Sequence, residues 1–315
     1  MKLIRFHLKP VTPWMTAWQA DTIAGLLAAL YVRAAGVEEA ELKLINPWRE
    51  AKPTLVVSDA FPDDLLPAPA NLALLPGIEE RDRKKVRTAA WLTQDEFRTV
   101  QGGSLPRLFD RPRKQPFRDA VRLRNSIDRT VDSVGEAGQL YEAAGQLLAA
   151  PGTLTIFARV GEDQVKWAAD LFGLLAEAGF GADAAVGAGE VELAGPPEEV
   201  TDLKPPGIED GWVSLSTFQP AANDPTHGYW RSFVKYGKLG PDLAVESVFK
   251  RPQWMLRAGA CFRCTGEHRD WYGHWINDEY LLPNRVRKDL RKAGIRPGQP
   301  AYALALPFRW VEPGA

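Results

Sequence analysis

The chain of 315 residues is 45% apolar and 25% charged, and its 39 Lys and Arg nearly balance 40 Asp and Glu. This length allows about two domains, and the abundant aromatic residues exclude an intrinsically disordered chain. Residues 23–32, the most apolar stretch of the N-terminal third, are too few to span a bilayer, which requires about 20. Residues 1–6 alternate like a strand and lack the features of a signal peptide. We therefore expect a cytoplasmic protein with no membrane partner, and the two cysteines exclude a disulfide framework.

The first predicted elements are a strand, a helix and a second strand. Residues 2–9 alternate apolar and polar side chains with a period of two, which predicts a half-buried strand. The apolar positions of residues 23–31 recur with helical spacing, and Asp21 and Thr22 are interpreted as the cap of this helix. Residues 54–58 are apolar and β-branched, which predicts a buried strand.

An irregular segment at about residues 60–150 separates these elements from the next ones. It is rich in Pro and Arg, with weak strand candidates at residues 86–92 and one short helix predicted at residues 138–148. A strand, a helix and a strand are then predicted at residues 153–160, 162–178 and 186–193. This order predicts an α+β fold: a ferredoxin-like βαββαβ sheet with two helices on one face and a long basic insertion. RNA-recognition domains present the helix-free face of such a sheet to single strands.

A second domain is predicted after a Pro-rich linker that begins at residue 196. The expected division is a first ferredoxin-like (RRM-like) domain at residues 1–195 and a second, more irregular ferredoxin-like domain at residues 196–315. The elements predicted in the second domain are three strands and one basic helix, at residues 212–218, 254–262, 301–311 and 284–293.

The near-zero net charge hides an uneven distribution. Residues 81–129 contain 14 Lys and Arg, 11 of them Arg, against 6 Asp and Glu. The segment therefore has a net charge of +8 and leaves −9 for the remainder. A solvated surface insertion is one interpretation. The predominance of Arg favours a polyanion partner, because the planar guanidinium makes bidentate phosphate contacts and stacks on bases.

A glycine cluster spans residues 179–189, between a predicted helix and a predicted strand. A helix cap explains Gly179, but Gly181, Gly187 and Gly189 need another reason, since glycine weakens a strand unless another backbone approaches closely. A dinucleotide-binding loop is excluded because such a loop follows a strand and opens a helix. The cluster favours a loop that lets a phosphodiester backbone lie against main-chain N–H groups, with pure packing as the alternative.

The element order, the basic insertion and the G-F-G-x-D-x-x-V-G-x-G loop together resemble the RAMP superfamily of CRISPR proteins. Within it, the chain resembles the subunit of type III-A (Csm) interference complexes that binds the 5′ handle of the crRNA. Residues 18–25, 57–62 and 124–129 carry the resemblance further. It covers the first domain well and the second only through residues 212–218.

The resemblance implies a non-catalytic RNA-binding subunit of an antiviral ribonucleoprotein, with no cofactor. Its implied partners are the crRNA 5′ handle, the large polymerase-like subunit and the neighbouring backbone RAMP subunit, and the insertion is expected to form a thumb-like hairpin against the crRNA. Many members of the superfamily carry Lys or Arg in the glycine loop, where this chain has Asp183. Phosphate contact there must rest on main-chain N–H groups or be weaker.

The candidate RNA-binding residues come from the loop after the first strand, the insertion and the glycine cluster. Trp14 is expected to stack on a base, and the polar residues of the insertion to donate to phosphate and the 2′-hydroxyl. A helix N-terminus capped by Asp128 is the alternative for residues 124–129. The candidates are Thr12, Trp14, Thr16, Arg122, Arg124, Asn125, Ser126, Ile127, Asp128, Arg129, Gly179, Phe180, Gly181, Gly187 and Gly189.

Two other interpretations remain open. Cys261, Cys264, His268 and His274 have the residue types that tetrahedral zinc accepts. The two cysteines would point to opposite faces of a continuous strand, however, so no metal site is expected. The alternative function is a metal-independent RAMP endoribonuclease that processes precursor crRNA with His7 as the base.

Overall fold

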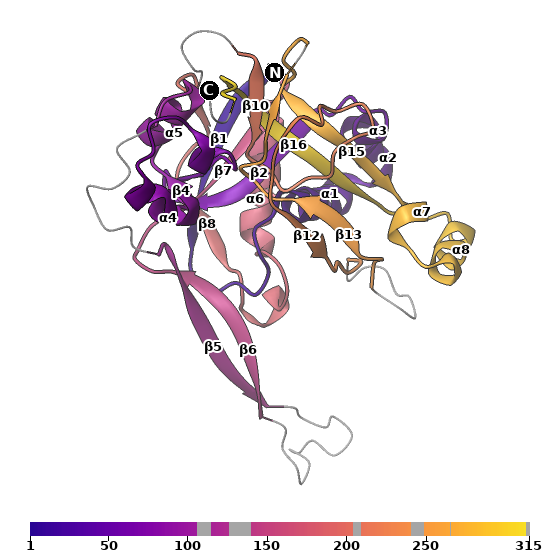
Figure 1. The fold of residues 1–315 in the computed structure, drawn as a ribbon. Coiled ribbons are helices and arrows are strands. Elements are labelled where there is room, and N and C mark those ends of the chain that lie inside the picture. Colours follow the sequence, from indigo (N-terminus) through magenta and orange to yellow (C-terminus); the bar gives the residue numbers. More distant parts are fainter. Residues whose placement is uncertain (106–114, 126–139, 204–208, 241–248, 265, 313–315) are drawn as a thin grey trace.

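The computed structural model describes residues 1–105, 115–125, 140–203, 209–240, 249–264 and 266–312. It is an α+β fold in which two antiparallel sheets form the body and one long hairpin projects from it (Figure 1). Within the described ranges, no helix is both long and apolar enough to cross a membrane.

The first half is one antiparallel sheet with helices on one face. Its strands lie in the order β2-β7-β1-β8, and β9 also pairs with β1. Phe6 of β1 stacks on Phe172 of α6 with ring centroids 4.0 Å apart, because alternate β1 side chains point toward the helices. The strands are β1 (Lys2–Pro10), β2 (Leu55–Pro62), β7 (Leu154–Val160), β8 (Val191–Leu193) and β9 (Glu198–Glu199). The helices are α1 (Ala20–Ala35), α2 (Val37–Ala40), the π-helix η1 (Glu41–Ile45), α3 (Asn46–Arg49), α6 (Val165–Ala178) and the 3-10 turn η3 (Ala184–Val186).

The insertion between β2 and β7 has two parts. Short elements pack on the body, and the hairpin β5–β6 extends away from it (Figure 1). The packed elements are β3 (Leu66–Pro67), the 3-10 turn η2 (Leu72–Leu74), α4 (Glu80–Thr88), β4 (Trp91–Leu92) and α5 (Gln94–Gln101). The hairpin consists of β5 (Phe117–Asn125) and β6 (Leu140–Leu148). A hairpin is therefore present where the thumb-like insertion was expected.

The second half contains a five-stranded antiparallel sheet in the order β11-β14-β10-β16-β15 and the separate hairpin β12–β13. Its strands are β10 (Gly211–Ser214), β11 (Gly228–Tyr229), β12 (Ser232–Lys235), β13 (Gln253–Leu256), β14 (Cys261–Arg263), β15 (Trp271–Asn277) and β16 (Gly298–Phe308). Its helices are α7 (Asp278–Leu281) and α8 (Asn284–Lys292). The main core continues across both halves, since Leu215 and Leu304 belong to the same buried cluster as Ile4.

Two secondary-structure predictions in the insertion are wrong. Residues 140–148 form the strand β6 and not a helix, because all nine residues pair with β5, and such non-local pairing overrides local helix propensity. Residues 80–88 form the helix α4, whereas a strand was predicted to begin at residue 86. Acidic residues in the first turn of α4 and basic residues in its last turn complement the helix dipole.

Glycines with positive φ interrupt two predicted strands. The strand expected at residues 186–193 is reduced to β8, because Gly187 and Gly189 have φ of +80° and +67°. The strand expected at residues 254–262 is divided into β13 and β14 by a turn at Gly259, whose φ is +89°. A side chain at Gly259 would place Cβ 2.5 Å from the carbonyl oxygen of Ala68, so this turn packs tightly against the insertion.

Candidate nucleic-acid interface

The loop after β1 and the glycine loop, predicted separately as RNA-binding segments, lie against each other. We call residues 12–16 and 179–190 together the loop junction. Thr12 Oγ1 accepts a hydrogen bond from the Glu190 N–H at 3.0 Å, and Thr16 Oγ1 accepts one from the Ala182 N–H at 2.9 Å. The Gly189 N–H donates to the Pro13 carbonyl at 2.8 Å. The structure therefore brings together candidates that are more than 160 residues apart in the sequence.

Close packing explains two of the four glycines. A Cβ at Gly181 would lie 2.6 Å from Thr16 Cβ, and one at Gly189 would lie 2.0 Å from the Phe180 carbonyl oxygen. Phe180 itself is buried and stacks on Trp18 with centroids 3.6 Å apart. By contrast, a Cβ at Gly187 would meet no atom within 4 Å. Among these glycines Gly187 is the position where an external backbone can approach most closely.

Most main-chain N–H groups of the glycine loop, residues 179–189, are engaged within the protein. Seven of them donate to other residues, two of these to the β1 loop. The seven belong to Gly179, Phe180, Ala182, Val186, Gly187, Ala188 and Gly189. A phosphate cannot use these donors without breaking the loop. Main-chain contact is therefore limited to N–H groups without an acceptor among the described residues, those of Gly181, Ala184 and Ala185.

Trp14 does not offer its ring to a base. The side chain is 2% exposed and meets Phe117 edge-to-face at a centroid distance of 6.1 Å. Its main chain pairs with Gln146 through two hydrogen bonds of 3.1 and 2.9 Å, which fix the base of the hairpin β5–β6 to the β1 loop. The predicted stacking role of Trp14 is wrong in this structure, because the indole is part of the core.

The two faces of the hairpin β5–β6 differ in charge. Arg118, Ala120 and Arg122 alternate along β5 and share one face, opposite Leu147, Gly145 and Ala143 of β6. We call this the Arg face. The other face carries Asp119 and Glu142. A Cβ at Gly145 would lie 2.6 Å from Met15 Sδ and 2.9 Å from the Trp14 carbonyl oxygen. The Arg face is therefore the side on which the β1 loop lies, and it adjoins the loop junction.

The remaining candidates of the insertion are only partly placed. Arg124 and Asn125 are the last residues of β5, so the expected helix N-terminus does not apply to them. Ser126, Ile127, Asp128 and Arg129 lie outside the described residues. The sequence analysis missed Arg118, although its spacing of four residues from Arg122 on a strand would have placed both on one face.

The helix-free face of the first sheet is covered over β2 and β7, whereas Lys9 and Glu192 at its β1–β8 edge are exposed, so it is not a fully open RNA platform. Phe157 of β7 points to this face, and its ring centroid lies 6.3 Å from that of Phe61. Phe61 in turn meets Trp91 of the insertion at 6.1 Å. The packed part of the insertion therefore covers the face that the fold alone would leave exposed, because these large rings are more stable when buried.

His7 of β1 lies on the helix-free face of the first sheet. Its Nδ1 is 3.0 Å from Thr155 Oγ1, and the Thr155 hydroxyl donates to the Asp63 carbonyl at 2.6 Å. Because that hydroxyl proton is already donated, Nδ1–H of His7 is the donor to Thr155. This bond holds the ring against β7, which is a structural role.

The four side chains of the zinc pattern have separate partners. Cys261 is buried, which raises the pKa of its thiol to about 12, and Sγ faces the Tyr229 carbonyl at 3.8 Å. Cys264 Sγ faces the Gly266 carbonyl at 3.2 Å. His274 Nε2 lies 2.9 Å from Gln219 Oε1, and burial lowers the pKa of His268 and His274. Across the described ranges, no three His, Cys, Asp or Glu side chains are arranged to hold a metal ion.

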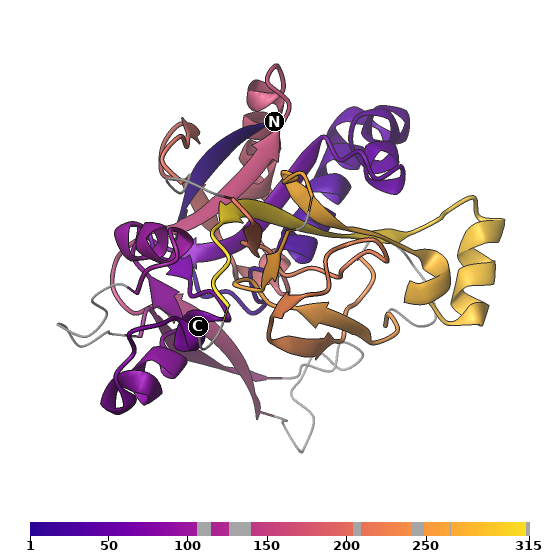
Figure 2. The same cartoon turned by 45° about the horizontal axis from the view of Figure 1, so that its top comes forward.

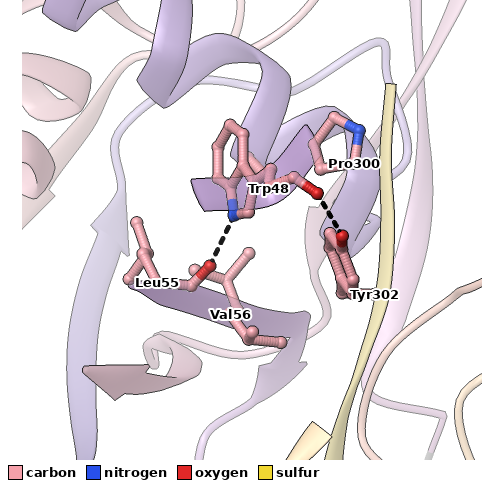
Figure 3. Close-up of a pocket in the computed structure, with 8 residues that line it drawn as sticks. Trp48, Leu55, Val56, Pro300 and Tyr302 are labelled. Carbon is pink, nitrogen blue, oxygen red and sulfur yellow. Dashed lines mark hydrogen bonds between the residues drawn. The ribbon is translucent and has the colours of Figure 1, made fainter. Parts of the chain in front are cut away.

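A small apolar pocket lies between α1, β2 and β16 (Figure 3). Its polar groups are already paired: Trp48 Nε1 donates to the Leu55 carbonyl at 2.8 Å, and the Tyr302 hydroxyl donates to the Trp48 carbonyl. The lining residues are Ala20, Ala24, Trp48, Leu55, Val56, Val57, Pro300 and Tyr302. With no free polar group to orient a ligand, this pocket is a packing feature of the core.

Comparison with known proteins identifies structural relatives. No family model and no curated protein matches the chain. A chain of a crystal structure of a Csm1–Csm4 cassette in complex with cA4 matches with a TM-score of 0.64 at 18% identity, covering 99% of this chain and 100% of the other. A chain of a Csm3–Csm4 subcomplex of the type III-A CRISPR-Cas interference complex matches with a TM-score of 0.59 at 13% identity, covering 98% and 100%. At identities this low, the matches show a shared fold. They confirm the resemblance predicted from the sequence as a resemblance of fold.

Proposed function

We propose that this chain is the crRNA-binding, non-catalytic subunit of a type III-A CRISPR (Csm) effector complex and caps the 5′ handle of the crRNA. Csm4 is the component that the matching Csm1–Csm4 cassette and Csm3–Csm4 subcomplex have in common. In this proposal the large polymerase-like subunit and a neighbouring backbone RAMP subunit are the protein partners. The acidic remainder of the chain supplies the surfaces for them, since the cations of the insertion are engaged by RNA.

The observation that carries the proposal is that the Arg face adjoins the loop junction. Arg118 and Arg122 project from one side of a strand pair whose base is fixed to the β1 loop. A backbone lying along this face would meet guanidinium groups first and then the open backbone at Gly187. Arg124, Asn125, Ser126 and Arg129 are proposed as further donors to the RNA. Thr12 and Thr16 retain hydroxyl protons that can donate to the 2′-hydroxyl.

We also propose two ferredoxin-like modules, with a division near residues 195 and 196. The order β11-β14-β10-β16 in the second half repeats the order β2-β7-β1-β8 of the first. In the second half, the described residues between β10 and β11 form no helix. β15, α7 and α8 lie between β14 and β16 in the chain. The pairing of β9 with β1 extends the first module to residue 199.

The proposal is tested by co-expressing the chain with its complex partners and a repeat-containing transcript. We expect purified complexes to contain RNA with the 5′ handle, and Arg118→Glu with Arg122→Glu to reduce the amount of RNA retained. The matched control is Arg296→Glu with Lys166→Glu. It changes the net charge by the same amount, at exposed positions that are far from the hairpin in the sequence. Assembly of the complete complex without handle-containing RNA would refute the proposal.

The same preparation tests for ribonuclease activity. Incubation with repeat RNA in EDTA is expected to leave the RNA intact, because His7 is held by Thr155 and the sheet face beside it is covered. Specific cleavage that disappears in His7→Ala would show that the chain processes the precursor transcript.

A further inference from the structure

A second surface, apart from the loop junction, combines exposed aromatic rings with cations. It consists of the hairpin β12–β13 and its flanks, residues 228–240 and 249–257, which contain six Lys or Arg, six aromatic residues and no Asp or Glu. The connecting residues 241–248, which include Asp242 and Glu246, lie outside the described residues. This positive segment lies outside residues 81–129, in the remainder of the chain, whose net charge is −9. The net charge of that remainder therefore does not reveal it.

One face of this hairpin attaches it to the body. Lys235 Nζ lies 2.6 Å from Asp21 Oδ1 and 2.7 Å from Thr22 Oγ1, at the start of α1. Met255, opposite Phe233 in the register, is fully buried in a cluster with residues of α7 and α8. The attachment therefore uses alternate residues of the two strands.

The other face leaves large apolar side chains in solvent. Val234 lies directly opposite Trp254, whose side chain is 46% exposed. Tyr236, two residues beyond Val234, is 76% exposed, and Phe249 is 58% exposed. A concentration of exposed rings on one short hairpin indicates a surface that a partner covers, whereas single exposed rings need no explanation.

Cations lie beside rings of this hairpin. Lys238 Nζ is 5.2 Å from the centroid of the exposed Phe249 ring. Arg257 Cζ is 4.4 Å from the centroid of Phe233, which shares the attached face with Met255, so Arg257 lies at the margin of the exposed face. Arg231 Nη2 lies 3.4 Å from the Arg87 carbonyl at the end of the basic helix α4, which extends the positive surface. Among the described residues, no carboxylate forms an ion pair with Arg231, Lys238 or Arg257.

We propose that this surface binds a single-stranded RNA segment, with bases stacked on Tyr236, Phe249 and Trp254 and phosphates beside Arg231, Lys238 and Arg257. Exposed rings interleaved with cations suit single strands, because every base has a stacking face and every nucleotide carries a negative phosphate. β12–β13 and β5–β6 are separate hairpins that leave the body at different places (Figures 1 and 2).

The test is a fluorescence-anisotropy titration of the purified full-length protein with short fluorescein-labelled oligo(U), which lacks the handle sequence. We expect Tyr236→Ala with Trp254→Ala to weaken binding about tenfold or more, since each stacked ring contributes about fivefold or more. Lys238→Gln should weaken it less and reduce the salt dependence. The matched control is Tyr280→Ala, which removes a 67% exposed ring of α7 outside this surface. Circular dichroism and thermal unfolding are used to verify that each variant is folded.

Three results would overturn this proposal. The first is oligo(U) affinity that is unchanged by the two ring substitutions. The second is affinity that falls as much in Tyr280→Ala. The third is loss of complex partners on purification of the ring variant while its oligo(U) affinity stays normal, which would make the surface a protein interface. If oligo(U) binding is lost in Arg118→Glu with Arg122→Glu while the ring variant binds normally, the first of these results has been obtained. The oligo(U) would then bind at the Arg face.

Discussion

The hairpins β5–β6 and β12–β13 are attached to the body in different ways. Main-chain bonds between Trp14 and Gln146 and the close approach permitted by Gly145 hold the base of β5–β6. For β12–β13, the attachment is through side chains, with Lys235 paired to Asp21 and Met255 buried. In the first hairpin, Arg118 and Arg122 therefore have no ion-pair partner among the described residues, whereas the second hairpin has one face attached to the body and the other exposed. Substitutions should separate the two: changes in the attached face of β12–β13 alter stability, and changes on the Arg face alter RNA binding.

One of the two largest effects on stability is expected for Lys235→Ala. The substitution removes the cation in direct contact with a buried carboxylate. Asp21 then keeps only the Gln299 hydrogen bond and the electrostatic attraction of Lys250. We expect a loss of about 3 kcal/mol in the free energy of unfolding, measured by urea denaturation. Lys238→Ala in the same hairpin is the control and should change stability by less than about 0.5 kcal/mol. Equal losses in the two variants would contradict the side-chain attachment of β12–β13.

Two glycine substitutions separate packing from binding at the loop junction that supports β5–β6. Gly189→Val should destabilise the protein by about 2 to 4 kcal/mol, because Cβ would be forced against the Phe180 carbonyl at a positive φ. Gly187→Val adds only the strain of the positive φ, about 1 to 2 kcal/mol, and should reduce RNA affinity. Thermal unfolding and RNA titration of both variants measure the difference. The sequence analysis favoured close approach of a phosphodiester backbone for the whole glycine cluster, and the packing at Gly189 leaves Gly187 as the better candidate for that role.

Charge reversal on the Arg face should leave stability unchanged. For Arg118→Glu with Arg122→Glu we expect RNA affinity to fall about tenfold or more. The slope of log affinity against log salt should decrease by about 1.4, because two phosphate contacts are lost. The measurement is a titration of crRNA at several salt concentrations, with Arg296→Glu and Lys166→Glu as the control pair. An unchanged slope would mean that these arginines contact no phosphate.

A pH effect is expected at the site where β12–β13 joins α1. Asp59 accepts hydrogen bonds from Ala20 N–H and from Thr217 N–H and Oγ1–H, but burial raises the pKa of its carboxyl to about 6. The folded state therefore binds this proton more tightly than the unfolded state. The stability contributed at Asp59 is lowest above pH 6 and increases as the pH falls toward 4.

The variant Asp59→Asn isolates this effect from opposing groups. Burial lowers the pKa of His268 and His274, so these groups destabilise the folded state as the pH falls. We expect the variant to gain stability relative to the parent protein at pH 7, on the order of 2 kcal/mol, and the gain to disappear near pH 4 to 5. Urea denaturation of both proteins between pH 5 and 7.5 measures it. A difference independent of pH would show that Asp59 does not titrate in this range.

Local patterns in the sequence predicted much of the first half correctly. Period-two and helical spacing located β1, α1, β2, β7 and α6, because in these elements the buried face is fixed by spacing along the chain. The Arg-rich insertion and the glycine loop were recognised for a similar reason, since charge and positive φ are properties of the residues themselves. Prediction failed at β6 and α4, where the outcome depended on a distant strand or on capping charges.

The exposure of aromatic rings shows what only the tertiary structure decided. Trp14 and Trp254 each lie in a short segment of mixed polar and apolar residues. Trp14 is nevertheless in the core against Phe117, whereas Trp254 is exposed on β13. The sequence determined the unequal charge, the glycine turns and the order of the elements. Which face the insertion covers, and which rings remain free, depended on contacts between residues far apart in the chain. Burial is a property of the assembled fold, and no local period encodes it.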